Sequence, residues 1–240
     1  SPDRVYPVYI DPTIVHDTSS EFSGAMNRTQ DTGSGTAPSI ESHHKQLTAD
    51  AYTVGLWHLD ESTENTCSGG EDACDLSGNN NHFISNSSTI DTGIINNGRS
   101  LNGTSDYLYA ANSTTLSPYT SDFTVEAWVK PGTVDGTRHR IYEDYSGAGT
   151  GALVLLWINV DNKFGGYYRD AASQSLITSG STTPVVGQWY HVAMVKQGKT
   201  ARLYVNGVLE HTVENTSIGT IDVSAGTGPQ IGRYGAGNNM

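Results

Sequence analysis

The chain has 240 residues, enough to bury a sizeable core in one β-sandwich domain. Its 25 acidic residues outnumber its 13 basic residues, so the formal net charge is −12. This balance argues against a nucleic-acid partner and against anionic membranes, because a phosphate surface requires a basic footprint. No apolar run reaches the roughly 18 residues that a membrane span needs, so we expect no membrane insertion.

The chain begins with a strand-like run at residues 4–15. In an extended backbone Tyr6, Val8 and Ile10 share one apolar face. Two prolines interrupt this run, and a proline cannot donate a ladder hydrogen bond. We therefore expect an edge strand or a connector here.

A polar stretch follows, rich in Ser, Thr, Gly and Asp, as is typical of a linker. The composition changes again near residue 51. We therefore predict that residues 1–50 form an N-terminal strand and polar arm, and that residues 51–240 form one domain.

The rest of the chain contains short β-rich runs separated by turn clusters. The runs lie at residues 54–59, 106–110, 123–129, 138–143, 152–159, 163–169, 189–196, 200–206 and 208–213. In the third run Phe123, Val125, Ala127 and Val129 face one way, and the residues between them face the other. Helix signals are nearly absent. These features predict an all-β fold: a two-sheet antiparallel jelly-roll sandwich with an extended N-terminal arm.

Two turns are indicated with particular clarity. Asn206-Gly207 lies between two strand runs and predicts a two-residue hairpin, because both central positions of that turn need a positive φ. Cys67 and Cys74 lie in a polar loop, where a disulfide would close one turn. The alternative is a pair of free thiols in a reducing cell. Scarce Lys and abundant Ser and Thr favour the disulfide and an extracellular or cell-surface location.

An ordered series of motifs runs through the domain. The motifs are Leu56-Trp57-His58-Leu59-Asp60, Asp75-Leu76-Ser77-Gly78-Asn79-Asn80-Asn81-His82, Ser100-Leu101-Asn102-Gly103 with Asp106-Tyr107-Leu108, Phe123 to Pro131, Gly187 to Ala193, Leu203 to Gly207, and Ile231-Gly232-Arg233. In this order they resemble the LamG-like, concanavalin A-like jelly-roll superfamily over about residues 52–240. The resemblance implies two stacked antiparallel sheets, an extracellular setting, frequent calcium, and binding rather than catalysis.

The sequence departs from the family pattern at its end. Members continue into a closing strand similar to F-D-G-x-I-D-E-V-R-I-Y, whereas this sequence stops at Asn238-Asn239-Met240. The open edge would need a strand from the N-terminal arm, from a neighbouring subunit, or from downstream sequence. The face formed by Tyr6, Val8 and Ile10 suits this role. Donation to a neighbour would be head-to-tail and would build a filament.

Catalytic motifs are missing from the sequence. Retaining glycosidases need two carboxylates about 5–5.5 Å apart, commonly on one strand face. Glu143 and Asp144 are adjacent and would point to opposite faces of a strand, and Glu126 stands alone. We therefore expect that the protein is not an enzyme.

Binding residues are easier to nominate. Asp60, Asp75 and Asp106, with Asn79, lie at loop motifs where family members hold a structural Ca²⁺, although the same carboxylates could simply cap turns. Glycans would need exposed aromatic platforms, for which the candidates are Trp157, Tyr167 and Tyr168, with Tyr142 and Tyr145 nearby in the sequence. Core packing is the alternative role for these rings.

The sequence thus predicts a non-catalytic extracellular structural or adhesive module of a microbial surface or secreted protein. Its partners would be copies of itself, neighbouring domains of a larger surface protein, or glycans. One alternative is a filament subunit that donates residues 5–15 to a neighbour. Another is a glycan-binding accessory module of a carbohydrate-active protein.

Overall fold

A computed structural model of the protein describes residues 46–146 and 153–233. Tyr6, Val8 and Ile10 lie outside these residues. The predicted assembly strand, and the division of the chain near residue 50, therefore stay predictions.

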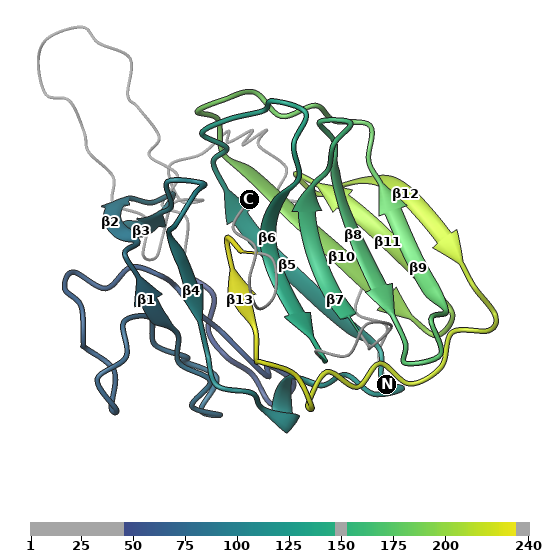
Figure 1. The fold of residues 1–240 in the computed structure, drawn as a ribbon, viewed down its shortest axis with the longest axis horizontal. Helices are drawn as coiled ribbons and strands as arrows, with labels where there is room; N and C mark the ends of the chain where they lie inside the picture. The colour runs from purple at the N-terminus through teal and green to yellow at the C-terminus, as the bar shows by residue number, and fades with distance from the viewer. Residues whose placement is uncertain (1–45, 147–152, 234–240) are drawn as a thin grey trace, which may run out of the picture.

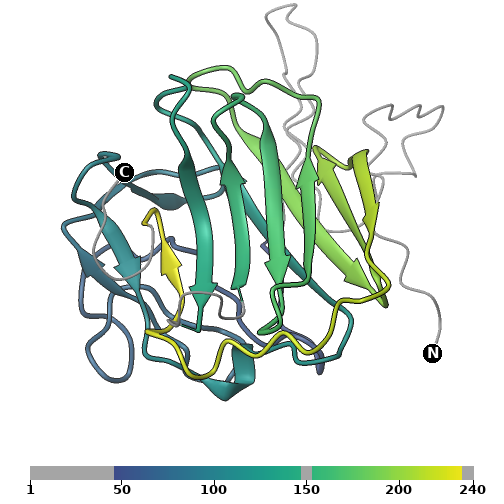
Figure 2. The ribbon, with the colours of Figure 1, turned by 45° about the vertical axis from the view of Figure 1, so that its right-hand side comes forward.

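Within the described residues, two antiparallel sheets stack against each other (Figures 1 and 2). The larger has seven strands in the order β1 (Ile84–Asn86), β4 (Tyr107–Tyr109), β13 (Gln230–Ile231), β6 (His139–Tyr145), β7 (Leu153–Ile158), β8 (Phe164–Arg169) and β9 (Ser175–Ser179). The smaller has four, in the order β12 (Val208–Glu214), β11 (Thr200–Val205), β10 (Tyr190–Gln197) and β5 (Phe123–Val129). This architecture confirms the predicted all-β sandwich.

Short elements complete the fold. Strands β2 (Thr89–Thr92) and β3 (Asn97–Ser100) form a separate hairpin, and a 3₁₀ turn, η2, covers Thr114–Leu116. The connection from β12 to β13 runs along the lower edge of the molecule (Figure 2). The expected turn between β11 and β12 is present, with Asn206 at φ 48° and Gly207 at φ 78°.

One predicted strand does not form. In the run 54–59 the backbone makes only an isolated bridge, between Trp57 and Asp75. The Leu56 N–H donates to the Asp75 carboxylate, and Leu59 has a positive φ of 59°, which interrupts an extended chain. Local side-chain hydrogen bonding has therefore replaced a ladder in this segment.

The main core lies between the two sheets. Alternate residues of β7, namely Val154, Leu156 and Ile158, are buried against β10 residues such as Val192 and Met194. A second cluster around Phe83 and Leu108 fills the space beneath β4, next to Trp57. Tyr142 of β6 packs against both clusters and joins them.

Strand β5 forms one edge of the smaller sheet in the described part of the chain, where it pairs with β10 alone. Its core-facing residues Phe123, Val125, Ala127 and Val129 are only half-buried. The core-facing residues of neighbouring β10 are buried, as Val192 and Met194 show. The sandwich core is thus thinly covered along this edge.

Candidate functional site

The outer face of the seven-stranded sheet carries a cluster of aromatic and aliphatic side chains. In β7, Leu155 and Trp157 point away from the core-facing residues that alternate with them, and they pack with Tyr145 of β6 and Tyr167 of β8. We call these four residues the aromatic face. Leu155 and Trp157 are buried, whereas Tyr145 and Tyr167 are half-buried. The two tyrosines are therefore its accessible rings.

Gly165 of β8 gives the Trp157 indole its place. It pairs with Trp157 across the ladder. A Cβ atom on Gly165 would lie 2.4 Å from Trp157 Nε1 and 2.6 Å from the Thr178 carbonyl oxygen. The indole can therefore lie over the neighbouring strand only because this residue has no side chain.

Arginine side chains surround these rings. The guanidinium carbons of Arg138 and Arg140 lie 4.5 and 5.6 Å from the centroid of the Trp157 ring. The guanidinium carbon of Arg169 lies 5.7 Å from the Tyr145 ring and 5.8 Å from the Tyr167 ring. Such contacts are favourable because the electron-rich ring face attracts a cation.

Two adjacent carboxylates of β6 point to opposite sides of the sheet. Glu143 pairs with Leu155 on the outer side and lies 3.2 Å from Arg140 Nη1. Asp144 pairs with core-facing Val154 and is 2 % exposed. Burial raises the pKa of Asp144 to about 8, and the nearby Glu143 adds to this shift. The two groups are therefore not arranged as a pair around one bond, which agrees with the expectation from their adjacency.

The structure separates the predicted ligand-binding residues. Trp157 and Tyr167 lie together on the aromatic face. Tyr168 lies on the opposite side of β8, fully buried in the core, where its hydroxyl donates to the Met194 carbonyl oxygen at 2.5 Å. Tyr142 also packs on the core side. Adjacent strand residues face opposite ways, so Tyr168 cannot serve as a platform beside Tyr167.

Our sequence-based list of site residues omitted the arginines. A signal for them was present: Arg138 and Arg140 are two residues apart, and so are Tyr167 and Arg169. Residues two apart on a strand share a face. What the spacing could not supply was the neighbour across the ladder, because pairing β6 with β7 is what brings Arg140 beside Trp157.

The predicted calcium ligands bind local donors instead. The Asp75 carboxylate accepts hydrogen bonds from the backbone N–H groups of Leu56, Ser77 and Asn81, and from the Ser77 hydroxyl. Asn79 donates through its side chain to the Val54 carbonyl oxygen. These contacts are those of a turn cap.

The other two carboxylates are held elsewhere. Asp60 accepts from the Gln46 and Asn96 side chains, and Asp106 accepts from Asn102 and Ser105. In the described ranges, Glu61, Cys67 and Cys74 are the acidic, His or Cys side chains that converge in a group of three, and two of them form a disulfide. These residues do not fit one calcium ion, and calcium stays a prediction that the contacts do not support.

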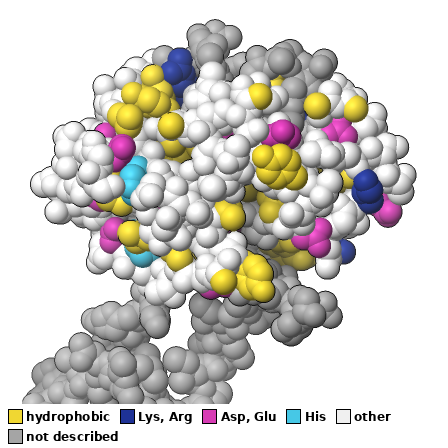
Figure 3. Space-filling model, turned by 90° about the horizontal axis from the view of Figure 1, so that it is seen from below, with side chains coloured by type: hydrophobic (Ala, Val, Ile, Leu, Met, Phe, Trp, Pro, Cys, Tyr) yellow, Lys and Arg dark blue, Asp and Glu magenta, His cyan; other side chains and the backbone are white. Residues whose placement is uncertain are grey.

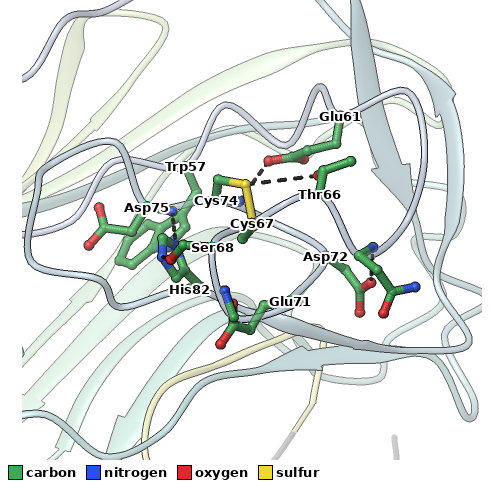
Figure 4. The surroundings of a disulfide bond; sticks show 12 residues. Trp57, Glu61, Thr66, Cys67, Ser68, Glu71, Asp72, Cys74, Asp75 and His82 are labelled. Carbon is green, nitrogen blue, oxygen red and sulfur yellow. Dashed lines mark hydrogen bonds between the residues drawn. A yellow bond between two sulfur atoms is a disulfide. The ribbon is translucent and has the colours of Figure 1, made fainter.

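The predicted disulfide between Cys67 and Cys74 is present, with a Cα–Cα distance of 5.3 Å (Figure 4). The Cys74 N–H donates to Glu61 Oε1 at 2.7 Å, and the next residue, Asp75, donates through its N–H to His82 Nδ1 at 2.8 Å. The bridge therefore fixes the loop that positions the Asp75 turn cap.

The described surface offers no other extended apolar site on the side seen in Figure 3. Visible apolar side chains there lie in small separate groups among polar atoms. None of the helices in the described segments has the length and hydropathy that would let it cross a membrane. The aromatic face therefore remains the candidate site with converging ring and charged groups.

Comparisons with known proteins identify the family. The model of the concanavalin A-like lectin/glucanases superfamily matches residues 102–240, more than half of the chain. The chain belongs to the concanavalin A-like lectin/glucanase superfamily. The match covers β4 to β13, and with them every strand of the aromatic face. No curated protein sequence matches the chain significantly.

Solved structures agree with this fold assignment. Domain 4 of AbnA, an extracellular GH43 arabinanase of Geobacillus stearothermophilus solved with arabinotriose, is 16% identical, with a TM-score of 0.53 over 69% of this chain and 79% of that domain. An S-layer domain-containing protein of Clostridium thermocellum is 20% identical, with a TM-score of 0.44, covering 72% of this chain and 74% of its own. Mouse laminin α1 domains LG4-5 are 14% identical, with a TM-score of 0.41, covering 49% and 29%.

Proposed function

We propose that this protein is a non-catalytic, extracellular adhesive module that binds glycans on the aromatic face. The observation that carries the proposal is the convergence of Tyr145 and Tyr167 with Arg138, Arg140 and Glu143 on one side of the larger sheet. Sugar-binding sites combine ring faces, which pack against the apolar side of a pyranose or furanose, with a few polar groups that hold hydroxyls. The arabinanase domain with bound arabinotriose supports this use of the fold.

The acidic residues of the larger sheet support a binding role over hydrolysis. Its described strands carry two carboxylates, Glu143 and Asp144, which lie on opposite faces. Glycoside hydrolysis needs two carboxyl groups on the same side of the scissile bond region, about 5–10 Å apart. A glycan lying on the aromatic face would therefore meet Glu143 without a second strand-borne acid.

The disulfide supports an extracellular location. Disulfides such as Cys67–Cys74 persist in oxidising compartments and are rare in the cytosol. The low content of Lys and the negative net charge fit a soluble surface or secreted module.

Tyr167→Ala tests the glycan proposal. We would screen the full chain on a broad glycan array and measure the affinity for the best ligand by calorimetry. The variant should bind at least tenfold more weakly. The matched control is Tyr204→Ala, a half-buried tyrosine of β11 on the outer face of the other sheet. An array without ligands, or equal losses in the two variants, would contradict the proposal.

Strand-donated assembly is the second candidate, and the thinly covered β5 edge favours it. The half-buried side chains of Phe123 and Val125 would gain cover if another strand paired beside them. The proposed donor is the run with Tyr6, Val8 and Ile10 of a neighbouring copy. Light scattering should then show a mass that rises with concentration, and replacing all three donor residues with Asp should return the monomer. A monomer at every concentration would rule this assembly out.

A further inference from the structure

The basic residues of this acidic protein are concentrated on the outer face of the larger sheet. The described residues include six arginines, and four of them lie over aromatic rings of this face. These four are Arg138, Arg140, Arg169 and Arg233. With a net charge of −12 and 13 basic residues in the whole chain, a random distribution would not gather positive charge here.

Arg233 extends the basic surface toward β4. Its guanidinium carbon lies 4.2 Å from the centroid of the Tyr107 ring. Tyr107 and Tyr109 alternate with core-facing Leu108, so both tyrosine rings lie on the outer side, 5.8 Å apart. The arginines and rings therefore span β4, β6, β7 and β8, which is roughly 19 Å across at about 4.8 Å per strand with β13 between β4 and β6.

Little acidic charge from the sheet opposes these arginines. Glu143 is the outward carboxylate of its described strands, and it pairs with Arg140. Asp144 points into the core. Arg138 donates through Nε to the Asn159 amide oxygen at 3.0 Å, a neutral partner. Neither Arg138 nor Arg233 forms an ion pair with a described carboxylate. Their positive charge is not cancelled by those neighbours.

We propose that the ligand of this face is an acidic glycan, whose carboxylate or sulfate groups bind the stacked arginines. This inference rests on the proposed glycan-binding function and narrows its ligand class. A guanidinium presents a planar fork of N–H donors that matches a carboxylate or a sulfate, and stacking on a ring holds that fork in place before the ligand arrives. Tyr145 and Tyr167 would pack against the sugar rings between the anionic groups.

A purely structural role for the arginines makes a different prediction. If their stems and guanidinium groups only shield the rings from water, an anionic ligand would gain nothing from them. Neutral and acidic forms of one polysaccharide would then bind alike. A comparison of matched ligands therefore separates the two roles.

The experiment uses the full chain and two matched pairs of polysaccharides: polygalacturonate with its methyl ester, and a sulfated galactan with its desulfated form. By calorimetry in 50 mM NaCl, an acidic form should bind at least tenfold more tightly than its neutral form, and this preference should shrink as salt increases. A preference confined to the first pair assigns carboxylates, and one confined to the second assigns sulfates.

Charge-removing variants complete the test. Arg138→Gln and Arg233→Gln should each reduce the acidic preference at least threefold, while binding of the neutral form stays within twofold. The control is Arg202→Gln, on the outer face of the smaller sheet, where Arg202 Nη1 donates to Gln197. Thermal unfolding checks that each variant is folded.

The outcomes separate the inference from the function on which it rests. Equal binding of acidic and neutral forms would overturn the acidic preference and leave glycan binding in place. An equal effect of Arg202→Gln would overturn it as well, because the site would then not be the aromatic face. If no glycan of either kind binds, here or on the array, the proposed function fails with it.

Discussion

At Gly165 the missing side chain decides what the neighbouring strand can carry. The Trp157 indole and the Thr178 carbonyl group occupy the space that a Cβ atom would need. Trp157 in turn lies beneath Arg138 and Arg140, so one glycine helps to position two charged groups. The geometry of the candidate site thus depends on a residue that makes no contact with a ligand.

Gly165→Ala should lower the free energy of unfolding by about 1–3 kcal/mol, because an extra methyl group in a packed region forces neighbours to move. Urea unfolding would measure the change. Gly132→Ala is the control, since a Cβ atom there has nothing within 4 Å and φ is not positive. Equal stabilities of the two variants would show that the Trp157 position does not depend on Gly165.

Asp144 makes stability depend on pH. Its folded pKa of about 8 lies far above the ordinary 3.8, with burial as the main cause. Between these values the folded state holds a proton that the unfolded state has released, so stability should fall as pH rises from about 4 to 8. Asp144→Asn should remove most of this fall. Urea unfolding at pH 5, 7 and 9 tests it, and parallel pH profiles for the two proteins would contradict the assignment.

At the scale of elements, the loop from Cys67 to Cys74 stabilises a region with little regular structure. Ala73 bridges to Phe83 through backbone hydrogen bonds, and Phe83 packs edge-on against Trp57 with ring centroids 5.0 Å apart. Few ladder hydrogen bonds hold this segment, so a covalent link that limits its unfolded conformations has a large relative effect.

Replacing both cysteines with serine should lower the free energy of unfolding by about 2 kcal/mol, the value expected for so short a loop. Chemical denaturation with and without reductant measures it. Reductant should destabilise the natural chain and leave the double variant unchanged. A midpoint that does not respond to reductant in either protein would show that the backbone contacts of the loop suffice.

At the scale of the whole molecule, the seven-stranded sheet connects two cores. One core fills the sandwich, and the other lies beneath β1 and β4. Tyr142 contacts both, and β13 pairs with β4 on one side and β6 on the other. We therefore expect the described domain to unfold in a single transition, since neither core can lose its structure without exposing part of the other.

Tyr142→Ala should lower the free energy of unfolding by about 3–5 kcal/mol, as for the loss of a large aromatic group from a core. It should also separate the two regions, giving a broadened or two-step thermal transition in calorimetry. Tyr204→Ala, on the outer face of the smaller sheet, should keep one sharp transition. A single sharp transition in both variants would show that the cores are coupled by other contacts.

Local sequence determined the strands and the turns. The alternation of Phe123, Val125 and Ala127 with polar residues predicted β5 with its bounds, since the two-residue period of a strand is a local property. Asn206-Gly207 predicted its hairpin, and Cys67 and Cys74 their bond, for the same reason. Short strands such as β13, with two residues, were not predicted, because pairing across the sheet and not local pattern creates them.

Tertiary structure alone decided which side chains meet. The sequence nominated Trp157, Tyr167 and Tyr168 together, but strand pairing places the first two on the outer face and Tyr168 in the core. It also brought Arg140 of β6 beside Trp157 of β7, a contact that no spacing along the chain encodes. A strand fixes the direction of its own side chains, whereas the register between strands fixes their neighbours, and that register is set by how the whole sandwich packs.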